Sequence, residues 1–178
     1  LVSSSAASDV YKRQLLLIVF SFLIGSAFSG FFIESSALKL GRRYGVALCI
    51  EGSLLLLSLG FLVQGDVYGQ YLASAACGLQ NAMITTFSGA VVRTTHMTGI
   101  ITDLGIMIGE SLRGRQFDRR KAKLFIFIFL GFLLGGTAGA ALFNVYELYA
   151  LVFPALLAFV IAIAYWGYLY LLSRKQAA

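Results

Sequence analysis

The chain has 178 residues, of which 59% are hydrophobic and only 12% are charged, and its mean hydropathy is +0.85. A soluble domain carries about 25% charged residues, so this composition excludes an ordinary soluble domain and predicts a protein embedded in the lipid bilayer. The formal net charge is +6. The basic residues stand in short segments between apolar runs, which indicates membrane orientation and argues against a nucleic-acid partner.

The first 14 residues differ from the rest of the chain. They are polar, lack the apolar core of a signal peptide and resemble translated adaptor or vector sequence. We therefore expect a non-native junction over residues 1–14, with the native N-terminus missing, and a single transmembrane domain over residues 15–175. A short native tail is the alternative interpretation.

Five apolar runs are long enough to cross a bilayer, for which about 20 residues are needed. The predicted spans are 15–33, 44–63, 70–92, 124–143 and 149–172. Another apolar piece, 100–110, is too short to cross and is predicted to be a half-helix that is either re-entrant or interfacial. The expected fold class is therefore an all-α polytopic membrane protein.

The distribution of basic residues predicts the orientation of the spans. The segments that follow the first span, precede the fourth and follow the fifth carry three, six and two basic residues, whereas the other two connections carry none. Lys and Arg concentrate in cytoplasmic loops, so the C-terminus is predicted to be cytoplasmic. The first, third and fifth spans then run in one direction and the other two run in the opposite direction.

The first and fourth spans are similar to each other. FLIGSAFSG (22–30) aligns with FLLGGTAGA (132–140), and both helices carry small residues at every fourth position. Those residues are Ser21, Gly25 and Ser29 in the first span and Gly131, Gly135 and Gly139 in the fourth. Small residues at this spacing allow helix backbones to approach closely in lipid. The similarity predicts an inverted 3+3 repeat whose first helix is missing, an arrangement found in many transporters.

At GLQNA (78–82) and RTTHMTGIITDLG (93–105) the chain resembles the YoaK-like family, domain of unknown function 1275. The matching residues are Gly78, Gln80, Asn81, Ala82, Arg93, Thr94, Thr95, Thr98, Gly99, Thr102, Asp103, Leu104 and Gly105. The resemblance implies a small multi-pass protein of the bacterial inner membrane. The family's earlier Thr-Gly-Asn element is absent, which supports a missing N-terminal part. Because the family has no settled activity, the resemblance bears on fold and location more than on function.

The polar segment after the third span is the candidate substrate site. Arg93 is either a membrane anchor or a clamp for an anionic group, which its planar guanidinium suits. The hydroxyls of Thr94, Thr95 and Thr98 and the backbone at Gly99 would line the site, and Thr98 is a candidate cap for the following helix. A helix N-terminus there would add free N–H groups for an anion. Gln80 and Asn81 are either interhelical hydrogen-bonding groups or solute ligands.

Three ionisable residues are candidates for proton or ion coupling. Glu51 stands in the middle of the second span, where a carboxyl group is costly unless it has a function or is neutralised. His96, the single histidine, titrates near neutral pH, although a structural role is the alternative. Asp103 either pairs with Arg93 or binds a coupling ion.

The motif inventory favours transport over catalysis. There is no phosphate-binding P-loop, no Gly-x-Ser-x-Gly elbow and no His-Glu-x-x-His motif. The two cysteines, Cys49 and Cys77, lack metal-ligand spacing and are predicted to be packing thiols, so we expect no metal and no cofactor. The leading hypothesis is a permease for a small, unidentified solute. The alternatives are a membrane partner or scaffold protein and an intramembrane hydrolase built on His96, a threonine and Asp103; a homo-oligomer is left open.

Overall fold

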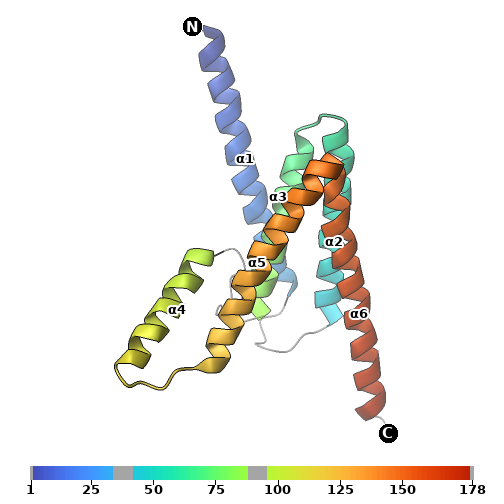
Figure 1. The fold of residues 1–178 in the computed structure, drawn as a ribbon. Coiled ribbons are helices and arrows are strands. Elements are labelled where there is room, and N and C mark those ends of the chain that lie inside the picture. Colours follow the sequence, from blue (N-terminus) through green and yellow to red (C-terminus); the bar gives the residue numbers. More distant parts are fainter. Residues whose placement is uncertain (1, 34–41, 88–95, 177–178) are drawn as a thin grey trace. The chain divides into compact units, whose positions relative to one another are not determined.

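The computed structural model describes residues 2–33, 42–87 and 96–176, which form helices and no strand. The helices are α1 (Val2–Phe32), α2 (Arg42–Val63), α3 (Tyr68–Phe87), α4 (Met97–Leu112), α5 (Arg119–Tyr146), the 3₁₀ helix η1 (Glu147–Leu151) and α6 (Val152–Gln176) (Figure 1). Helix α1 includes most of the 14 residues set apart in the sequence, and its apolar part begins at Asp9.

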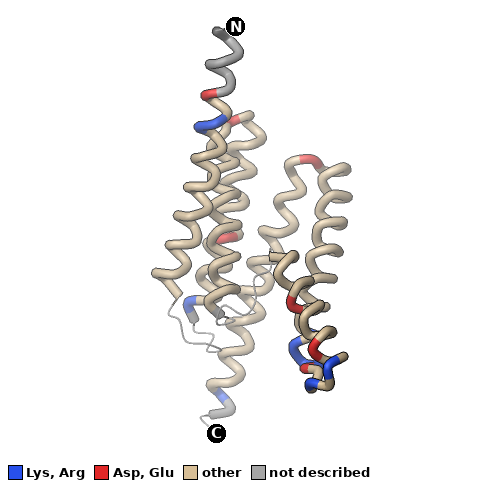
Figure 2. The backbone as a smooth tube through the Cα atoms, turned by 90° about the vertical axis from the view of Figure 1, so that its left-hand side faces the viewer, with Lys and Arg blue, Asp and Glu red and all other residues tan. Residues whose placement is uncertain are grey.

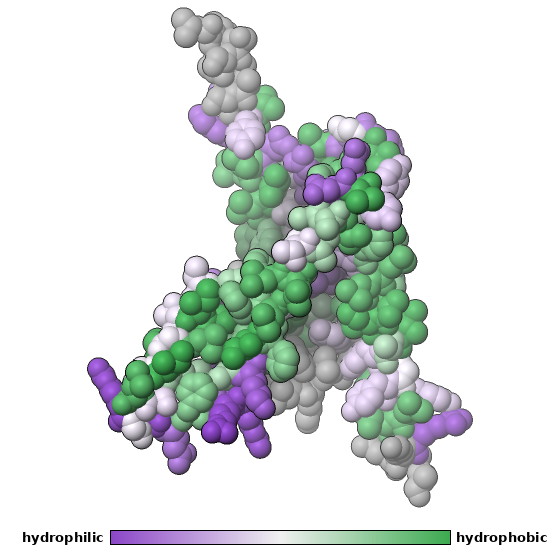
Figure 3. Space-filling model, in the orientation of Figure 1, coloured by the Kyte–Doolittle hydropathy of each residue, from purple (hydrophilic) through white to green (hydrophobic). Residues whose placement is uncertain are grey.

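The protein is an all-α polytopic membrane protein. Within the described ranges, three apolar runs are long enough to cross a bilayer: Asp9–Phe32, Arg43–Val63 and Arg119–Arg174. The third run contains both α5, with 28 residues, and α6, with 25 residues. At about 1.5 Å per residue each of these two helices exceeds the hydrocarbon thickness of about 30 Å. Apolar side chains accordingly cover much of the visible surface of the helices (Figure 3).

The chain forms two compact units, residues 1–91 with 148–178 and residues 92–147. In the first unit, α1 and α3 make their closest contact through two glycines. A Cβ atom on Gly25 would overlap the carbonyl group of Ala75, and a Cβ atom on Gly78 would overlap the carbonyl group of Phe22. Only glycine allows the two backbones to approach so closely. Small residues were predicted to line one face of the first span and to allow close helix packing. Gly25 is one of them, and it has this role against α3.

Two serines show that α1 and α3 run parallel. Ser74 Oγ donates to the carbonyl oxygen of Ile18 at 2.7 Å, and Ser26 Oγ donates to that of Gly78 at 3.0 Å. Ile18 pairs with Ser74, and the later residue Ser26 pairs with the later residue Gly78. Residue numbers therefore increase in the same direction along both helices, as in a parallel pair. This agrees with the relative direction that the basic loops predict for the first and third spans.

Helix α2 lies between α3 and α6 and is antiparallel to both. The hydroxyl of Ser58 donates to the carbonyl oxygen of Gly69 on α3 at 2.7 Å. On the side of α6, the aromatic rings of Trp166 and Phe159 lie directly against Gly45 and Gly52. The buried core of this packing is Ala47, Leu48, Leu79, Met83 and Ala162.

Helix α3 is more polar than its neighbours and is not among the three apolar runs. It contains Gln70, Gln80 and Asn81, yet it packs along α1 on one side and α2 on the other. Asn81 is half-buried in this packing, whereas Gln70 and Gln80 are exposed, and Gln70 accepts a hydrogen bond from Gln14 of α1 at 2.6 Å.

The second unit is the hairpin of α4 and α5. Helix α4 has 16 residues, or about 24 Å of helix, which is less than the bilayer core. It corresponds to the piece predicted at 100–110 and begins three residues earlier. The connecting turn contains Gly114 at φ = 85°, a backbone conformation that favours glycine. Asp118 caps α5, because its side chain accepts hydrogen bonds from the backbone N–H groups of Arg120 and Lys121 at 3.0 Å.

Candidate functional site

The predicted substrate segment is only partly described. Arg93, Thr94 and Thr95 lie outside the described residues, so the anion clamp stays a prediction. The described part, His96 to Gly99, forms the start of α4. His96 and Thr98 are exposed, so this end of α4 presents polar groups at its surface.

The N-cap of α4 differs from the expectation. The structure places His96, and not Thr98, at the N-cap position, with φ = −94° and ψ = 57° and no side-chain capping hydrogen bond. Thr98 lies within the first turn, where its carbonyl oxygen accepts a hydrogen bond from the Thr102 hydroxyl at 2.8 Å. The capping role suggested for Thr98 was therefore wrong, because the helix begins before it. Among the described residues, no side chain caps the first N–H groups of α4.

Gly99 makes room for the imidazole of His96. A Cβ atom at position 99 would stand 2.6 Å from His96 Nδ1 and 3.2 Å from Cε1. The ring therefore folds back over the first turn of α4. The sequence indicated that Gly99 allows a close approach, and in this structure the approaching group is the neighbouring imidazole.

Asp103 lies one turn further along α4 and is exposed. Its predicted partner Arg93 is outside the described residues, and no cation of the described part of the chain forms an ion pair with it. Its pairing and its ion-binding role both stay predictions.

The GLQNA motif presents its residues to different surroundings. Gly78 contacts α1 and Leu79 belongs to the buried core, whereas Gln80 is exposed. Asn81 is half-buried, and its carbonyl oxygen accepts the hydroxyl of Thr85 at 2.7 Å. The motif thus combines helix packing with one exposed amide, so the structure does not bring Gln80 and Asn81 together on one surface.

Glu51 is the one charged residue that is buried among the described residues, with 5% of its surface exposed. It follows Arg43, the start of the apolar run, by about 12 Å of helix, which places it near the middle of the span. It precedes Ser58 by seven residues, or about two turns, so it occupies the face of α2 that packs on α3. Its carboxyl group is close enough to Cys77 of α3 to act on it electrostatically.

One oxygen of this carboxyl group lacks a partner. Glu51 Oε2 is buried, and no group in the described ranges forms a hydrogen bond with it. A buried polar atom without a hydrogen bond is costly and requires an explanation, such as a bound water, a proton or an ion. The position therefore has the chemistry of a reversible proton or cation site.

Ser29 of α1 is a second buried group of this kind. It is 1% exposed, and its Oγ atom has no hydrogen-bond partner within the described part of the chain. Ser29 precedes Ile33 by one turn, and Ile33 packs against the core cluster that contains Ala47. Glu51 follows Ala47 by one turn. Among the described residues, the two buried oxygens without a hydrogen-bond partner are therefore Ser29 Oγ on α1 and Glu51 Oε2 on α2. Each stands one helical turn from a residue that belongs to this cluster or packs against it.

The sequence offered no signal for Ser29 as a polar site. Its four-residue spacing from Gly25 indicated helix packing, and its burial agrees with that interpretation. The described residues contain no group of three or more His, Cys, Asp or Glu side chains that could hold a metal ion.

Comparison with known proteins gives one match. The family model described as "Protein of unknown function (DUF1275)" matches residues 1–164. No curated protein and no solved structure matches the chain. The match covers all of the motifs described above.

Proposed function

Because this chain belongs to the DUF1275 family and is a multi-pass membrane protein, we propose that it is a permease that moves a small solute across the bacterial inner membrane. The observation that carries the proposal is Glu51, a buried carboxyl group near the middle of a span, one oxygen of which has no hydrogen-bond partner among the described residues. A charged side chain at the centre of a membrane helix costs about 2.5–3.5 kcal/mol. An apolar residue such as leucine would avoid that cost, so a role for the carboxyl group is the simplest reason for its presence.

Glu51 is the coupling residue in this proposal. A carboxyl group is tolerated in a low-dielectric environment when it is protonated, and it can release the proton when a conformational change exposes it to water. His96 and Asp103 are the other two candidates. Both are exposed, so neither carries the cost of a buried charge. We therefore assign the coupling proton or cation to Glu51.

The solute site lies at the start of α4 in this proposal. The first N–H groups of α4, which no described side chain caps, and the exposed Thr98 offer hydrogen-bond donors to an anionic group. Arg93, three residues earlier in the chain, would add a charge that matches a carboxylate or a phosphate. The solute is therefore expected to be a small anion.

Two further functions were weighed. A scaffold protein predicts that buried polar groups pair with one another, whereas Glu51 and Ser29 keep unpaired oxygens among the described residues. An intramembrane hydrolase predicts a hydroxyl nucleophile bonded to His96, and the described ranges contain no such hydrogen bond. The permease hypothesis is the one that these observations support best.

The test is uptake of radiolabelled small anions into proteoliposomes with an imposed pH gradient. We expect Glu51→Gln, which keeps the shape of the side chain, to abolish accumulation driven by the gradient while solute exchange at equal pH persists. Ser53→Ala is the matched control, since Ser53 lies on the same helix, is exposed and bonds only to its own helix at Cys49. Arg93→Ala should weaken the apparent affinity. The absence of uptake for a broad panel of anions, or uptake that Glu51→Gln leaves unchanged, contradicts the proposal.

A further inference from the structure

The connection between α4 and α5 and the first turns of α5, residues 113–123, carry the densest charge of the described chain, and we call this stretch the basic loop. Its six basic residues, all exposed, are Arg113, Arg115, Arg119, Arg120, Lys121 and Lys123. Figure 2 shows Lys and Arg gathered at this loop. Only two acidic residues, Glu110 and Asp118, stand in or beside this stretch, so an excess of four positive charges remains. We propose that this loop binds the phosphate headgroups of anionic lipids.

The two acidic residues are already engaged locally. The Glu110 carboxylate forms an ion pair with Arg115 at 2.8 Å. The Asp118 carboxylate accepts the backbone N–H groups of Arg120 and Lys121 as the cap of α5. Of the basic side chains in this loop, only Arg115 is ion-paired within the described residues. Lys121 Nζ lies over the ring of Phe125, 5.4 Å from its centroid. The other four cationic groups are therefore available to an external anion.

The loop also has the form of a membrane-interface site. It joins two apolar helices, and its second half overlaps the start of the apolar run of α5, which begins at Arg119. Phe117, which is 40% exposed, lies between the basic residues. An exposed apolar ring beside basic residues inserts at the boundary between headgroups and acyl chains, so Phe117 is expected to hold the neighbouring basic residues close to the lipid phosphates.

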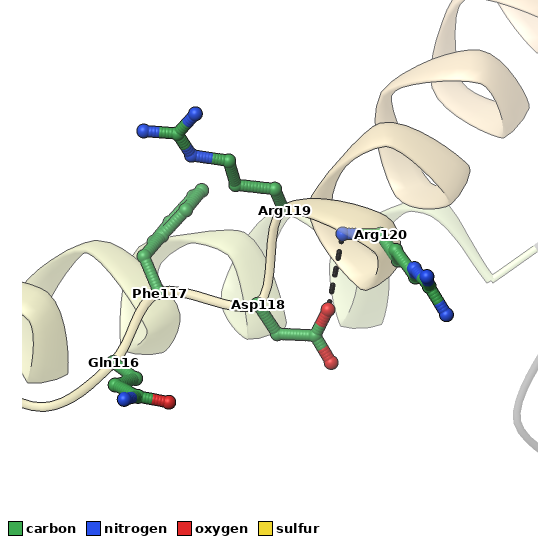
Figure 4. A pocket seen from close by; sticks show the side chains of 5 residues that line it. All are labelled: Gln116, Phe117, Asp118, Arg119 and Arg120. Carbon is green, nitrogen blue, oxygen red and sulfur yellow. Dashed lines mark hydrogen bonds between the residues drawn. The ribbon is translucent and has the colours of Figure 1, made fainter.

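The side chains of the loop form an open pocket of about 380 Å³, lined by residues 116–120. Figure 4 shows Phe117 and Arg119 rising on the same side of the loop, whereas Gln116 and Asp118 point to the other side. An aromatic ring beside a guanidinium group suits a ligand that has both an acyl chain and a phosphate. A free phosphate ion would gain nothing from Phe117, and so the lipid is the favoured source of the anion.

Orientation in the membrane alone does not account for these features. Basic residues that set topology need only be present near the end of a span. That role does not require the neighbouring acidic residues to be paired locally, and it does not require an aromatic residue in the same pocket. Clusters of Lys and Arg next to a span attract anionic lipids, with a gain of about fivefold in binding per basic residue near the membrane surface.

The experiment uses tryptophan quenching by brominated lipids in the full chain, reconstituted in nanodiscs. Phe117→Trp, in a background of Trp166→Phe, places the single reporter in the loop. Tyr146→Trp in the same background is the matched control, because it stands at the opposite end of α5. Brominated phosphatidylglycerol is compared with brominated phosphatidylcholine, each as a minor component of a phosphatidylcholine bilayer.

We expect the anionic lipid to be enriched at least about tenfold over the zwitterionic lipid at position 117, and about equally with it at position 146. Arg119→Gln with Arg120→Gln should reduce the enrichment at position 117 to about twofold or less. High salt should also reduce it, since surface electrostatics are screened. Equal quenching by both lipids at position 117 overturns the proposal. Displacement of the brominated lipid by millimolar inorganic phosphate would instead show that the loop binds free phosphate.

A second measurement requires no reporter. The thermal midpoint of the unaltered chain should rise when phosphatidylglycerol is added to the nanodisc, because a ligand that binds the folded state stabilises it. The rise should be lost in Arg119→Gln with Arg120→Gln. An equal rise in both proteins contradicts the assignment to this loop.

Discussion

The contact between Gly25 and α3 makes a quantitative prediction about stability. In Gly25→Ala, the new Cβ atom would overlap the carbonyl group of Ala75. The overlapping atoms belong to the backbone and cannot rotate away, so α1 and α3 must separate by about 1 Å or more to restore a contact of about 3.5 Å. Overpacking of this kind typically costs about 1–3 kcal/mol. Separation would also weaken the hydrogen bonds of Ser26 and Ser74, at about 0.6 kcal/mol each.

A control in the same helix removes the effect of helix propensity. Gly30 has open space around its Cβ position, so Gly30→Ala should stabilise the helix by about 0.5–1 kcal/mol. The two variants change the chain identically, so the gain in helix propensity cancels. They are expected to differ by the cost of overpacking and of the weakened hydrogen bonds, about 1–4 kcal/mol in the free energy of unfolding. The assay is reversible unfolding in mixed micelles, followed by circular dichroism. If Gly25→Ala is as stable as Gly30→Ala, the close approach of α1 and α3 is not present in the protein.

Three further predictions concern single side chains. Ser58→Ala should destabilise the first unit by about 0.6–1.7 kcal/mol, because the hydroxyl is fully buried and donates to Gly69; an unchanged unfolding midpoint would contradict this. Asp118→Ala should cost about 1 kcal/mol through loss of the α5 cap, whereas Asp118→Asn should retain most of the stability; equal losses in the two variants would argue against capping. Gly99→Ala should displace the imidazole of His96 and shift its Cε1–H resonance in NMR spectra, with a change in stability below about 1 kcal/mol; an unmoved resonance would mean that the ring does not lie over the first turn.

Ser74, Ser58 and Ser29 differ in hydrogen bonding in a way that the sequence could not predict. All three are serines within helices of the first unit. Ser74 and Ser58 donate to carbonyl groups on neighbouring helices, whereas Ser29 Oγ has no described partner. Their local sequences do not distinguish them, because the partner of each hydroxyl is set by the position of another helix.

The start of α4 gives a second example. Thr98 has a better capping side chain than His96, and sequence reasoning therefore favoured it. The structure starts the helix at Met97 and places His96 at the N-cap. Local preference for a cap is worth only about 1 kcal/mol, which the packing of the surrounding chain can outweigh.

The sequence by itself determined the class of the protein, the approximate positions of the apolar helices and the family. Hydropathy and span length are properties of contiguous residues, and the bilayer imposes a minimum length of apolar helix. The prediction of 44–63 for the second span accordingly lies close to α2 at Arg42–Val63. The resemblance rested on the order and spacing of two motifs, and the family match confirmed it.

Only the tertiary structure decided which polar groups are buried and which of them lack a partner. The sequence placed Glu51 in a span but could not show that its Oε2 atom is enclosed without a hydrogen bond, and it did not single out Ser29 as a polar site. The satisfaction of a buried oxygen depends on the rotation and register of two or three helices against one another. Those quantities follow from side-chain packing between residues far apart in the chain, which no local pattern records.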